Sequence, residues 1–284
     1  MSLNPTPRTE PGAADRFRAI AGNLPLCQAS VRAAFEQGQF RLAYQPILRA
    51  GDAALVGCEA LLRWTHPLQG EQSPSQFVPI LERSRLALEV GDWVVEEAAR
   101  QVVAWNASGA NLRLAVNVAP VQVQAPDFPQ RITDRLDRAG LAPDRLTLEI
   151  TQATLLDRPE QSGHQLARLA MTGVDIHLDD FSFGPSSLSN LHALALTGIK
   201  LDRRFIGGLD EGGARTELRT IVNLARSLGL RTIAECVQSD RELAAVEELG
   251  IDEVQGHLFC PAIPPEAFES YLGARLSGKP SRGD

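Results

Sequence analysis

A series of acidic and amide side chains is spread along this chain, each close to the end of a short apolar run. The series comprises Glu59, Asn117, Glu149, Asp179 with Asp180, Lys200 with Asp202, Glu235 and Gln255. A single polar residue in such a place is usually a helix cap or a hydrogen-bonded core group. Seven such places in succession are better explained by side chains that meet in one shared site.

Three glutamates, two aspartates and an asparagine of this series offer oxygen ligands, and neither His nor Cys belongs to it. Oxygen ligands select hard divalent cations such as Mg²⁺, Mn²⁺ or Ca²⁺ over zinc. Several carboxylates facing one cavity would repel each other unless cations neutralised them. Two metal ions that share Asp179 would polarise a phosphoryl group and activate a water molecule. The chemistry indicated is the hydrolysis of a phosphodiester.

The elements that must position these residues alternate between strands and helices. Helical spacing of apolar residues predicts helices over Leu86–Ala107, Val121–Ala139, Gln161–Met171 and Leu218–Leu228, and a further helix is expected over Ala13–Phe35. Runs of aliphatic residues predict strands at Phe40–Leu48, Leu55–Trp64, Leu112–Val118, Leu146–Thr151, Val174–Asp179, Gly198–Asp202, Leu230–Glu235 and Glu253–Phe259.

About eight strands with interleaved helices favour an α/β fold, a modified (β/α)8 barrel of the TIM type, over an open doubly wound sheet. The first two strands form a hairpin around Gly51, which makes one strand antiparallel to the others. Chemistry in such barrels takes place at the carboxyl ends of the strands, where the polar series falls. We expect the barrel to span residues 13–275, between a linker at 1–12 and a tail at 276–284.

Composition excludes several classes of protein. The chain has 284 residues, 28 Lys and Arg against 35 Asp and Glu, and a formal net charge of −7. That balance argues against binding of duplex nucleic acid, which requires many cationic side chains. Four widely spaced cysteines predict a reduced, cytoplasmic protein, with Cys58 and Cys236 as buried, inert thiols. No apolar stretch approaches the length of a membrane helix, so no membrane contact is expected.

The run Cys58-Glu59-Ala60-Leu61-Leu62-Arg63-Trp64 resembles the signature that gives the EAL domain family its name. Further motifs of that family follow in order from about Phe35 to Tyr271: Tyr44-Gln45-Pro46, Val116-Asn117-Val118, Glu149-Ile150-Thr151, Asp179-Asp180-Phe181, Lys200-Leu201-Asp202, Ala234-Glu235 and Gln255-Gly256. The resemblance implies a barrel with one reversed strand and the hydrolysis of cyclic di-GMP, a bacterial second messenger, to linear pGpG.

The same resemblance implies roles for individual residues. Glu59, Asn117, Glu149 and Asp179 would bind one Mg²⁺ or Mn²⁺ ion, and Asp179, Asp180 and Glu235 a second, with Ca²⁺ inhibitory. Lys200 would hold or polarise the attacking water, and Gln255 would hydrogen-bond in the same cluster. Substrate would contact Gln45, Leu62, Arg63, Asp180 and His257. The implied partners are cyclic di-GMP, an upstream sensor domain in a longer protein, and a second copy of the chain in a homodimer.

The sequence departs from the family pattern in places that leave alternatives open. Gln152 replaces a glutamate after Glu149-Ile150-Thr151, and Ser182, Phe183 and Pro185 alter the loop after Asp180. We expect the site to bind metal but to turn over slowly, since residues that orient ligands affect activity. One alternative is a receptor that binds the nucleotide with little or no turnover. Another is an enolase-like barrel, which uses Mg²⁺, carboxylates and a lysine base on carboxylate substrates.

Overall fold

The computed structural model describes residues 26–180, 195–207 and 212–277. Its helices and strands are α2 (Gln28–Glu36), β1 (Phe40–Arg49), β2 (Leu55–His66), β3 (Gly70–Gln72), α3 (Pro74–Glu82), α4 (Leu86–Ala107), β4 (Arg113–Asn117), α5 (Pro120–Val123), α6 (Phe128–Ala139), the 3-10 helix η1 (Pro143–Arg145), β5 (Leu146–Thr151), α7 (Gln152–Asp157), α8 (Pro159–Ala170), β6 (Asp175–Asp179), β7 (Gly198–Leu201), α10 (Arg203–Ile206), α11 (Gly212–Ser227), β8 (Arg231–Ala234), α12 (Asp240–Leu249), β9 (Glu253–Val254) and α13 (Pro265–Leu276).

Eight of the strands in the described residues close into a barrel. Hydrogen bonds join them in the order β1-β9-β8-β7-β6-β5-β4-β2, and a pairing between β1 and β2 completes the ring. Strands β2 and β4 to β9 are parallel to one another, whereas β1 runs antiparallel to β9. The predicted barrel with one reversed strand is therefore confirmed. Strand β3 is not part of the ring; it pairs antiparallel with the last residues of β2.

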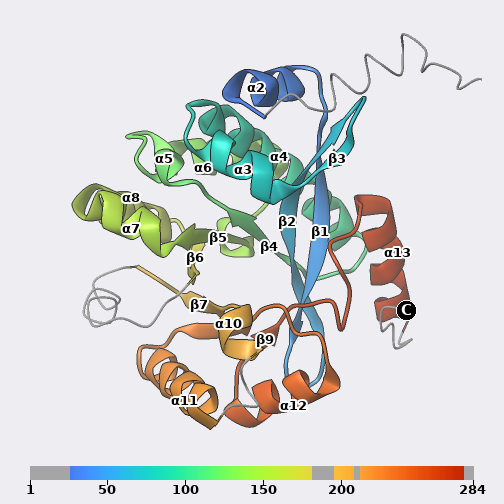
Figure 1. Ribbon diagram of the computed structural model, residues 1–284, viewed down its shortest axis with the longest axis vertical. Coiled ribbons are helices and arrows are strands. Elements are labelled where there is room, and N and C mark those ends of the chain that lie inside the picture. Colours follow the sequence, from blue (N-terminus) through green and yellow to red (C-terminus); the bar gives the residue numbers. More distant parts are fainter. Residues whose placement is uncertain (1–25, 181–194, 208–211, 278–284) are drawn as a thin grey trace, which may run out of the picture. The chain divides into compact units, whose positions relative to one another are not determined.

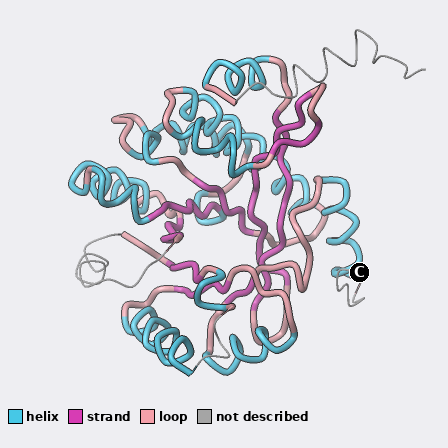
Figure 2. Tube along the Cα trace, in the orientation of Figure 1, coloured by secondary structure: helices cyan, strands magenta, loops and turns pink. Residues whose placement is uncertain are grey.

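The chain divides into two compact units, of which the larger contains residues 42–62 and 82–284. Within the described part of this unit, the strands form the inner layer and helices such as α8, α11 and α12 the outer layer (Figures 1 and 2). The strands are almost entirely apolar where they face the helices, as in β5, where Leu146, Leu148 and Ile150 are fully buried. This alternation leaves every second residue of a strand for the barrel interior.

The smaller unit contains residues 1–41 and 63–81. Its described part has an aromatic core in which the ring of Phe40 lies 5.9 Å from that of Trp64 and 5.7 Å from that of Phe77. The indole N–H of Trp64 donates a hydrogen bond to Gln39 Oε1 at 2.9 Å. The ends of β1 and β2 thus have a packed core of their own in this unit.

Several predicted helices need correction. The predicted helix Val121–Ala139 is two helices, α5 and α6, because the chain turns between Gln124 and Asp127 before Pro129 restarts a helix. The helices predicted from Gln161 and Leu218 begin earlier, at Pro159 and Gly212. Of the helix predicted over Ala13–Phe35, the described part is α2, and residues 13–25 lie outside the described residues.

Two other predictions are wrong in detail. The predicted strand Glu253–Phe259 is only the two residues of β9, because a turn begins directly after Gln255. The thiol of Cys58 is buried as expected, but Cys236 is exposed, since it lies past the end of β8. The predicted helix end at Gly140 is confirmed, with a positive φ of 76°.

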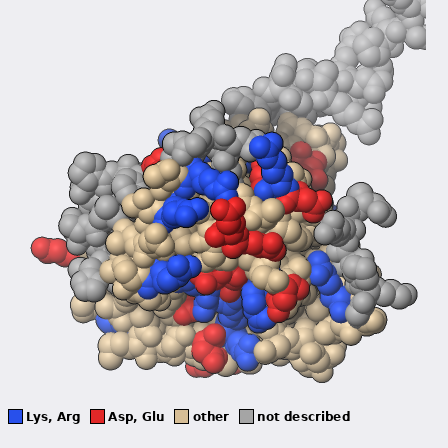
Figure 3. Space-filling model, turned by 90° about the horizontal axis from the view of Figure 1, so that it is seen from below, with Lys and Arg blue, Asp and Glu red and all other residues tan. Residues whose placement is uncertain are grey.

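Two surface properties bear on possible partners. No helix in the described residues is both long and apolar enough to cross a lipid bilayer. On the face drawn in Figure 3, the basic and acidic side chains of the described residues are interspersed, so the cationic groups there have anionic neighbours.

Candidate active site

A layer of carboxylates lies inside the barrel where the parallel strands end. Register places Asn117 beside Glu149 across β4 and β5, and Asp179 beside Thr151 across β5 and β6. The backbone N–H of Glu235 donates to Leu201 O at 2.9 Å, which fixes the exit of β8 against that of β7. We call Glu59, Glu149, Asp179 and Glu235 the carboxylate layer.

The ammonium group of Lys200 lies among these carboxylates. Its Nζ is 2.6 Å from Glu235 Oε1, 2.7 Å from Glu149 Oε2 and 3.4 Å from Glu59 Oε2. The side chains of Lys200 and Glu149 are only 2% and 1% exposed, so these contacts are shielded from water. One cation therefore holds together three acidic groups from three different strands.

Amide side chains complete the arrangement around Glu59. Asn117 Nδ2 donates to Glu59 Oε1 at 2.6 Å, and Gln255 Nε2 donates to Glu59 Oε2 at 2.7 Å. Gln255 Nε2 also lies 2.9 Å from Gln45 Oε1, and Gln45 Nε2 donates to the Cys260 carbonyl at 3.2 Å. With one bond to each of its oxygens, the Glu59 carboxylate has a fixed orientation.

Burial and charge shift the pKa values of this site in different directions. Burial, followed by repulsion from Glu59, raises the pKa of Glu149 well above its usual value, and burial raises the pKa of Glu235 to about 7. Burial also raises the pKa of Asp179. Burial would raise the pKa of Glu59 too, but Lys200 and the amide donors reverse that effect and lower it.

Lys200 remains a cation in this environment. Burial alone would lower its pKa, but attraction to the carboxylates, Glu149 first and then Glu235, raises it well above its ordinary value. Four carboxylates nevertheless face one ammonium. The layer therefore carries more acidic than basic groups, and the pKa values of three of its acids are raised first by burial and then by repulsion between the carboxylates.

The donor set of this layer fits hard divalent cations. It consists of carboxylate and amide oxygens, the ligands that Mg²⁺ and Mn²⁺ prefer, and its surplus of negative charge is what a cation would neutralise. In the described residues, no three acidic, histidine or cysteine side chains already stand in the arrangement of a closed metal site. The carboxylates surround Lys200 instead, so the fit rests on the chemistry and charge of the donors.

The other predicted site residues do not belong to the carboxylate layer, and they differ in exposure and in their contacts. Asp180 and His257 are exposed just beyond β6 and β9, and Leu62 is half-buried in β2. Arg63 belongs to the smaller unit, where its Nε lies 3.9 Å from Glu71 Oε1. Asp202 caps α10, because its carboxylate accepts a hydrogen bond from the backbone N–H of Arg204. The altered residues Ser182, Phe183 and Pro185 lie outside the described residues.

Two backbone features shape the mouth of the barrel. Asp180 and Cys236 have positive φ values of 53° and 56°, which non-glycine residues seldom adopt. After Gln255 the chain passes so close to the exit of β8 that a Cβ on Gly256 would lie 2.1 Å from the Val237 carbonyl oxygen. Only glycine fits there, which explains why it follows Gln255.

A second set of charged residues, which was not predicted from the sequence, lies at the opposite ends of β4, β6, β8 and β9. Arg113, Asp175, Arg231 and Glu253 form a lower ion-pair cluster, in which Arg113 Nη2 is 2.5 Å from Glu253 Oε1 and Arg231 Nη1 is 3.3 Å from Asp175 Oδ2. Each lies two or four residues before a site residue, for example Arg231 before Glu235. Because strand residues two apart share a face, this spacing was a usable signal.

Comparison with known proteins agrees with this geometry. The sequence profile described as the EAL domain matches residues 28–262. This chain belongs to the EAL domain family. It is 36% identical over 83% of its length to the bifunctional diguanylate cyclase/cyclic di-GMP phosphodiesterase MucR of Pseudomonas aeruginosa, and 34% identical over 87% to the cyclic di-GMP phosphodiesterase NbdA of the same organism.

A solved structure is similar as well. The PaMucR phosphodiesterase in complex with c-di-GMP has a TM-score of 0.80 and 35% sequence identity, covering 84% of this chain and 98% of that one. By contrast, this chain spans only about a third of the full length of the curated relatives, 35% of MucR and 32% of NbdA. Family membership excludes the enolase-like alternative.

Proposed function

We propose that this domain hydrolyses cyclic di-GMP to linear pGpG with the help of two divalent cations. The observation that carries the proposal is the carboxylate layer at the carboxyl ends of the barrel strands, where three acids contact the ammonium of Lys200 and a fourth, Asp179, is attracted to it. The names of MucR, NbdA and the c-di-GMP complex support the identity of the substrate.

Each group of residues has a task in this reaction. Glu59, Asn117, Glu149 and Asp179 would hold one ion, and Asp179, Asp180 and Glu235 the other. Bound there, Mg²⁺ or Mn²⁺ would polarise the phosphodiester and make a water molecule a stronger nucleophile. In the hydrolysis, the oxygen of a water molecule would bond to phosphorus and the bond from phosphorus to the 3′ oxygen would break. The proton that the water loses is balanced by the proton that the leaving oxygen takes up.

The chain's own residues prepare this reaction by fixing charge and orientation. Asn117 and Gln255 hold the Glu59 carboxylate at both oxygens, so it need not reorient during the reaction. Lys200 stays protonated and supplies positive charge close to where negative charge develops on the phosphate. Gln45 accepts a hydrogen bond from Gln255 and would contact the substrate at the edge of the layer.

The test is direct. Purified protein is mixed with cyclic di-GMP and Mg²⁺, Mn²⁺ or Ca²⁺, and the products are separated by chromatography. We expect pGpG with Mg²⁺ or Mn²⁺, and inhibition by Ca²⁺, which prefers longer and looser coordination. Absence of pGpG with every metal would refute the proposed hydrolysis.

The second candidate function is a receptor that binds cyclic di-GMP without hydrolysing it. The observation in its favour is the replacement of the family glutamate by Gln152 together with the altered loop at Ser182, Phe183 and Pro185. Calorimetry that detects nucleotide binding in the absence of any pGpG would establish this alternative. An upstream sensor, a homodimer and a cytoplasmic location remain predictions.

A further inference from the structure

The turn that follows β8 holds an unfavourable backbone conformation directly beside the carboxylate layer. Cys236, the residue after Glu235, has a φ of 56°. In this left-handed region the Cβ crowds the following carbonyl oxygen, so the conformation is less favourable than the right-handed one. Such a conformation persists only where neighbouring groups hold it. The groups that hold Cys236 therefore also determine where Glu235 points.

Backbone hydrogen bonds fix both sides of this turn. The N–H of Glu235 donates to Leu201 O at 2.9 Å, and the N–H of Val237 donates to Gln255 O at 3.1 Å. The carbonyl of Cys236 lies between these two points, and it accepts a hydrogen bond from Arg203 Nη1 at 3.1 Å. Arg203 is the first residue of α10, three positions after Lys200.

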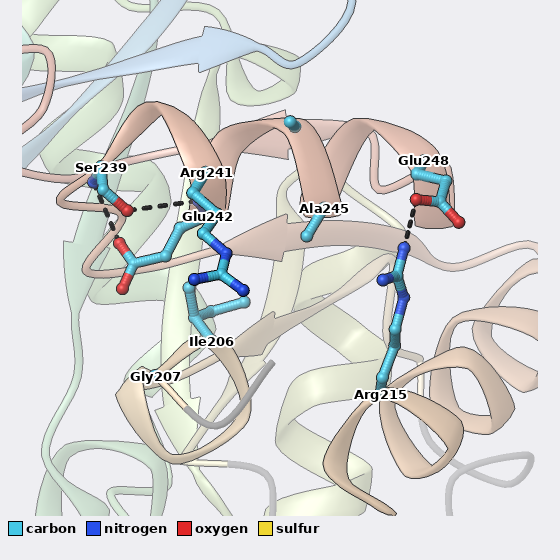
Figure 4. A pocket seen from close by; sticks show the side chains of 9 residues that line it. Ile206, Gly207, Arg215, Ser239, Arg241, Glu242, Ala245 and Glu248 are labelled. Atoms are coloured by element: carbon cyan, nitrogen blue, oxygen red, sulfur yellow. Dashed lines mark hydrogen bonds and ion pairs between the residues drawn. The ribbon is translucent and has the colours of Figure 1, made fainter. Parts of the chain in front are cut away.

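The guanidinium of Arg203 is held from a second side by α12. Its Nη1 lies 3.5 Å from Glu242 Oε1. Glu242 is itself fixed, because its other carboxylate oxygen accepts the backbone N–H groups of Gln238 at 2.6 Å and Ser239 at 3.1 Å. The Ser239 hydroxyl accepts the N–H of Glu242 in return, which makes the capping box visible in Figure 4.

A cavity beside this contact increases the importance of the side-chain link. It has a volume of about 370 Å³ and is lined by Ile206 and Gly207 from the end of α10, by Arg215 from α11, and by Ser239, Glu242 and Ala245 from the start of α12 (Figure 4). Side chains therefore leave part of the space between these helices unfilled. The guanidinium of Arg203 links the end of β7 to the turn after β8.

We propose that Arg203 is a positioning residue for the hydrolysis, which acts by holding the Cys236 carbonyl and, through it, the carboxylate of Glu235. This inference rests on the proposed function, in which Glu235 is a metal ligand. Arg203 does not touch the reacting atoms. Its loss should let the strained turn relax and move Glu235, which lowers the rate of the chemical step more than the affinity for substrate.

The experiment compares Arg203→Ala with a matched control, Arg204→Ala. Arg204 is the next residue, is 62% exposed, and pairs with Asp202 at 2.7 Å. We expect Arg203→Ala to lower kcat by about 10–100-fold, the typical cost of losing a residue that orients a metal ligand, with KM changed less than about twofold. Arg204→Ala should leave both constants within about twofold of wild type.

The decisive variant adds Cys236→Gly to Arg203→Ala. Glycine adopts a positive φ without strain, so the turn should keep its shape without the guanidinium. We expect the kcat of the double variant to be at least about fivefold higher than that of Arg203→Ala. A general loss of stability would not be repaired in this way, because the second substitution removes strain at a single residue.

Hydrogen exchange at the Val237 amide tests the positioning role without substrate. We expect its exchange to be about tenfold faster in Arg203→Ala, and normal in Arg204→Ala and in the double variant. Unchanged exchange in Arg203→Ala, or a kcat that Cys236→Gly does not restore in an active enzyme, would overturn the inference. If wild type forms no pGpG, the proposed function fails, and the exchange measurement still decides whether Arg203 holds the turn.

Discussion

The two ends of the barrel interior differ in their balance of acidic and basic side chains. In the lower ion-pair cluster, two arginines face two acids, and each acid lies within 3.5 Å of a guanidinium. In the carboxylate layer, Glu59, Glu149 and Glu235 contact the ammonium of Lys200 and Asp179 is attracted to it, so four acids face one cation. Strands β6 and β8 contribute to both clusters, with Asp175 four residues before Asp179 and Arg231 four residues before Glu235, so the fold does not impose the difference.

The contrast separates a structural role from a functional one. Balanced ion pairs close the lower end without requiring any further group, and partnering in this way is how buried charges are normally tolerated. An unbalanced cluster raises the pKa values of its own members and is unfavourable until cations arrive. We infer that the carboxylate layer binds cations. The predictions below test this difference, beginning with the largest expected effect.

Asp179→Ala should abolish hydrolysis of cyclic di-GMP, with a loss of roughly 10³-fold or more under every metal, because two bound ions contribute several kcal/mol to the transition state. The matched control is Asp175→Asn, on the same strand and face but in the lower cluster. It should retain activity within about threefold. Chromatography of pGpG measures both. Equal losses in the two variants would remove the distinction between the two ends.

Lys200→Met should destabilise the metal-free protein by about 3–5 kcal/mol, since it leaves buried carboxylates without their cation. The free energy of unfolding in urea, measured with a chelator, gives this value. Added Mn²⁺ should recover part of the loss, because a bound cation replaces the missing charge. A metal-free stability equal to that of wild type would show that Lys200 does not balance the carboxylate layer.

Glu253→Gln should cost about 1–3 kcal/mol of stability and leave kcat within about twofold of wild type. The substitution removes the acid that Arg113 and Arg231 share, so that partly buried donors lose a charged partner. Glu248→Gln serves as the control, since this 60% exposed acid pairs with Arg215 on the surface. It should change stability by less than about 0.5 kcal/mol. A large fall in kcat for Glu253→Gln would give the lower cluster a catalytic role.

His177 lies between the two clusters and should make stability depend on pH. Burial, with the positive charges of Arg231, Lys200 and Arg113, lowers its pKa well below 6.5. The imidazole of His177 therefore binds a proton more tightly in the unfolded chain than in the folded one. Its contribution to the free energy of unfolding is fully present above about pH 6.5. Below that pH the contribution is lost, by up to about 1.4 kcal/mol per pH unit.

The measurement compares wild type with His177→Gln in urea unfolding between pH 7.5 and 5. The variant should have the flatter profile over the lower part of this range. Carboxylates with raised pKa values act in the opposite direction, but they are present in both proteins and cancel in the difference. Parallel profiles would show that His177 does not titrate in this way.

Much of this architecture could be predicted from the residues. The helix Leu86–Ala107 was placed with both ends correct, because its apolar stripe extends over its whole length. The barrel followed from alternation of strands and helices, and the carboxylate layer from acids placed at successive strand ends. These features are local in the sequence, or repeat with a regular period, and therefore leave a pattern.

Other features depend on contacts that no local pattern records. The predicted strand through Phe259 ended early, because the turn at Gln255 and Gly256 is set by the neighbouring exit of β8. That Lys200 holds the attacking water stays a prediction, but the contacts of its ammonium with Glu149 and Glu235 arise from three-dimensional packing and left no pattern in the sequence. The exposure of Cys236 likewise follows from how the chain leaves β8, which the surrounding sequence did not reveal.

Gly256 has a consequence for the interpretation of genetic screens. A Cβ at this position would meet the backbone of Val237, at 2.1 Å from its oxygen and 2.4 Å from its nitrogen, so no rotamer change could make room. Any replacement must separate the two chain segments that carry Glu235 and Gln255. A search for inactive mutants would therefore recover substitutions of Gly256 as readily as those of the acids, although glycine has no group to contribute to the reaction.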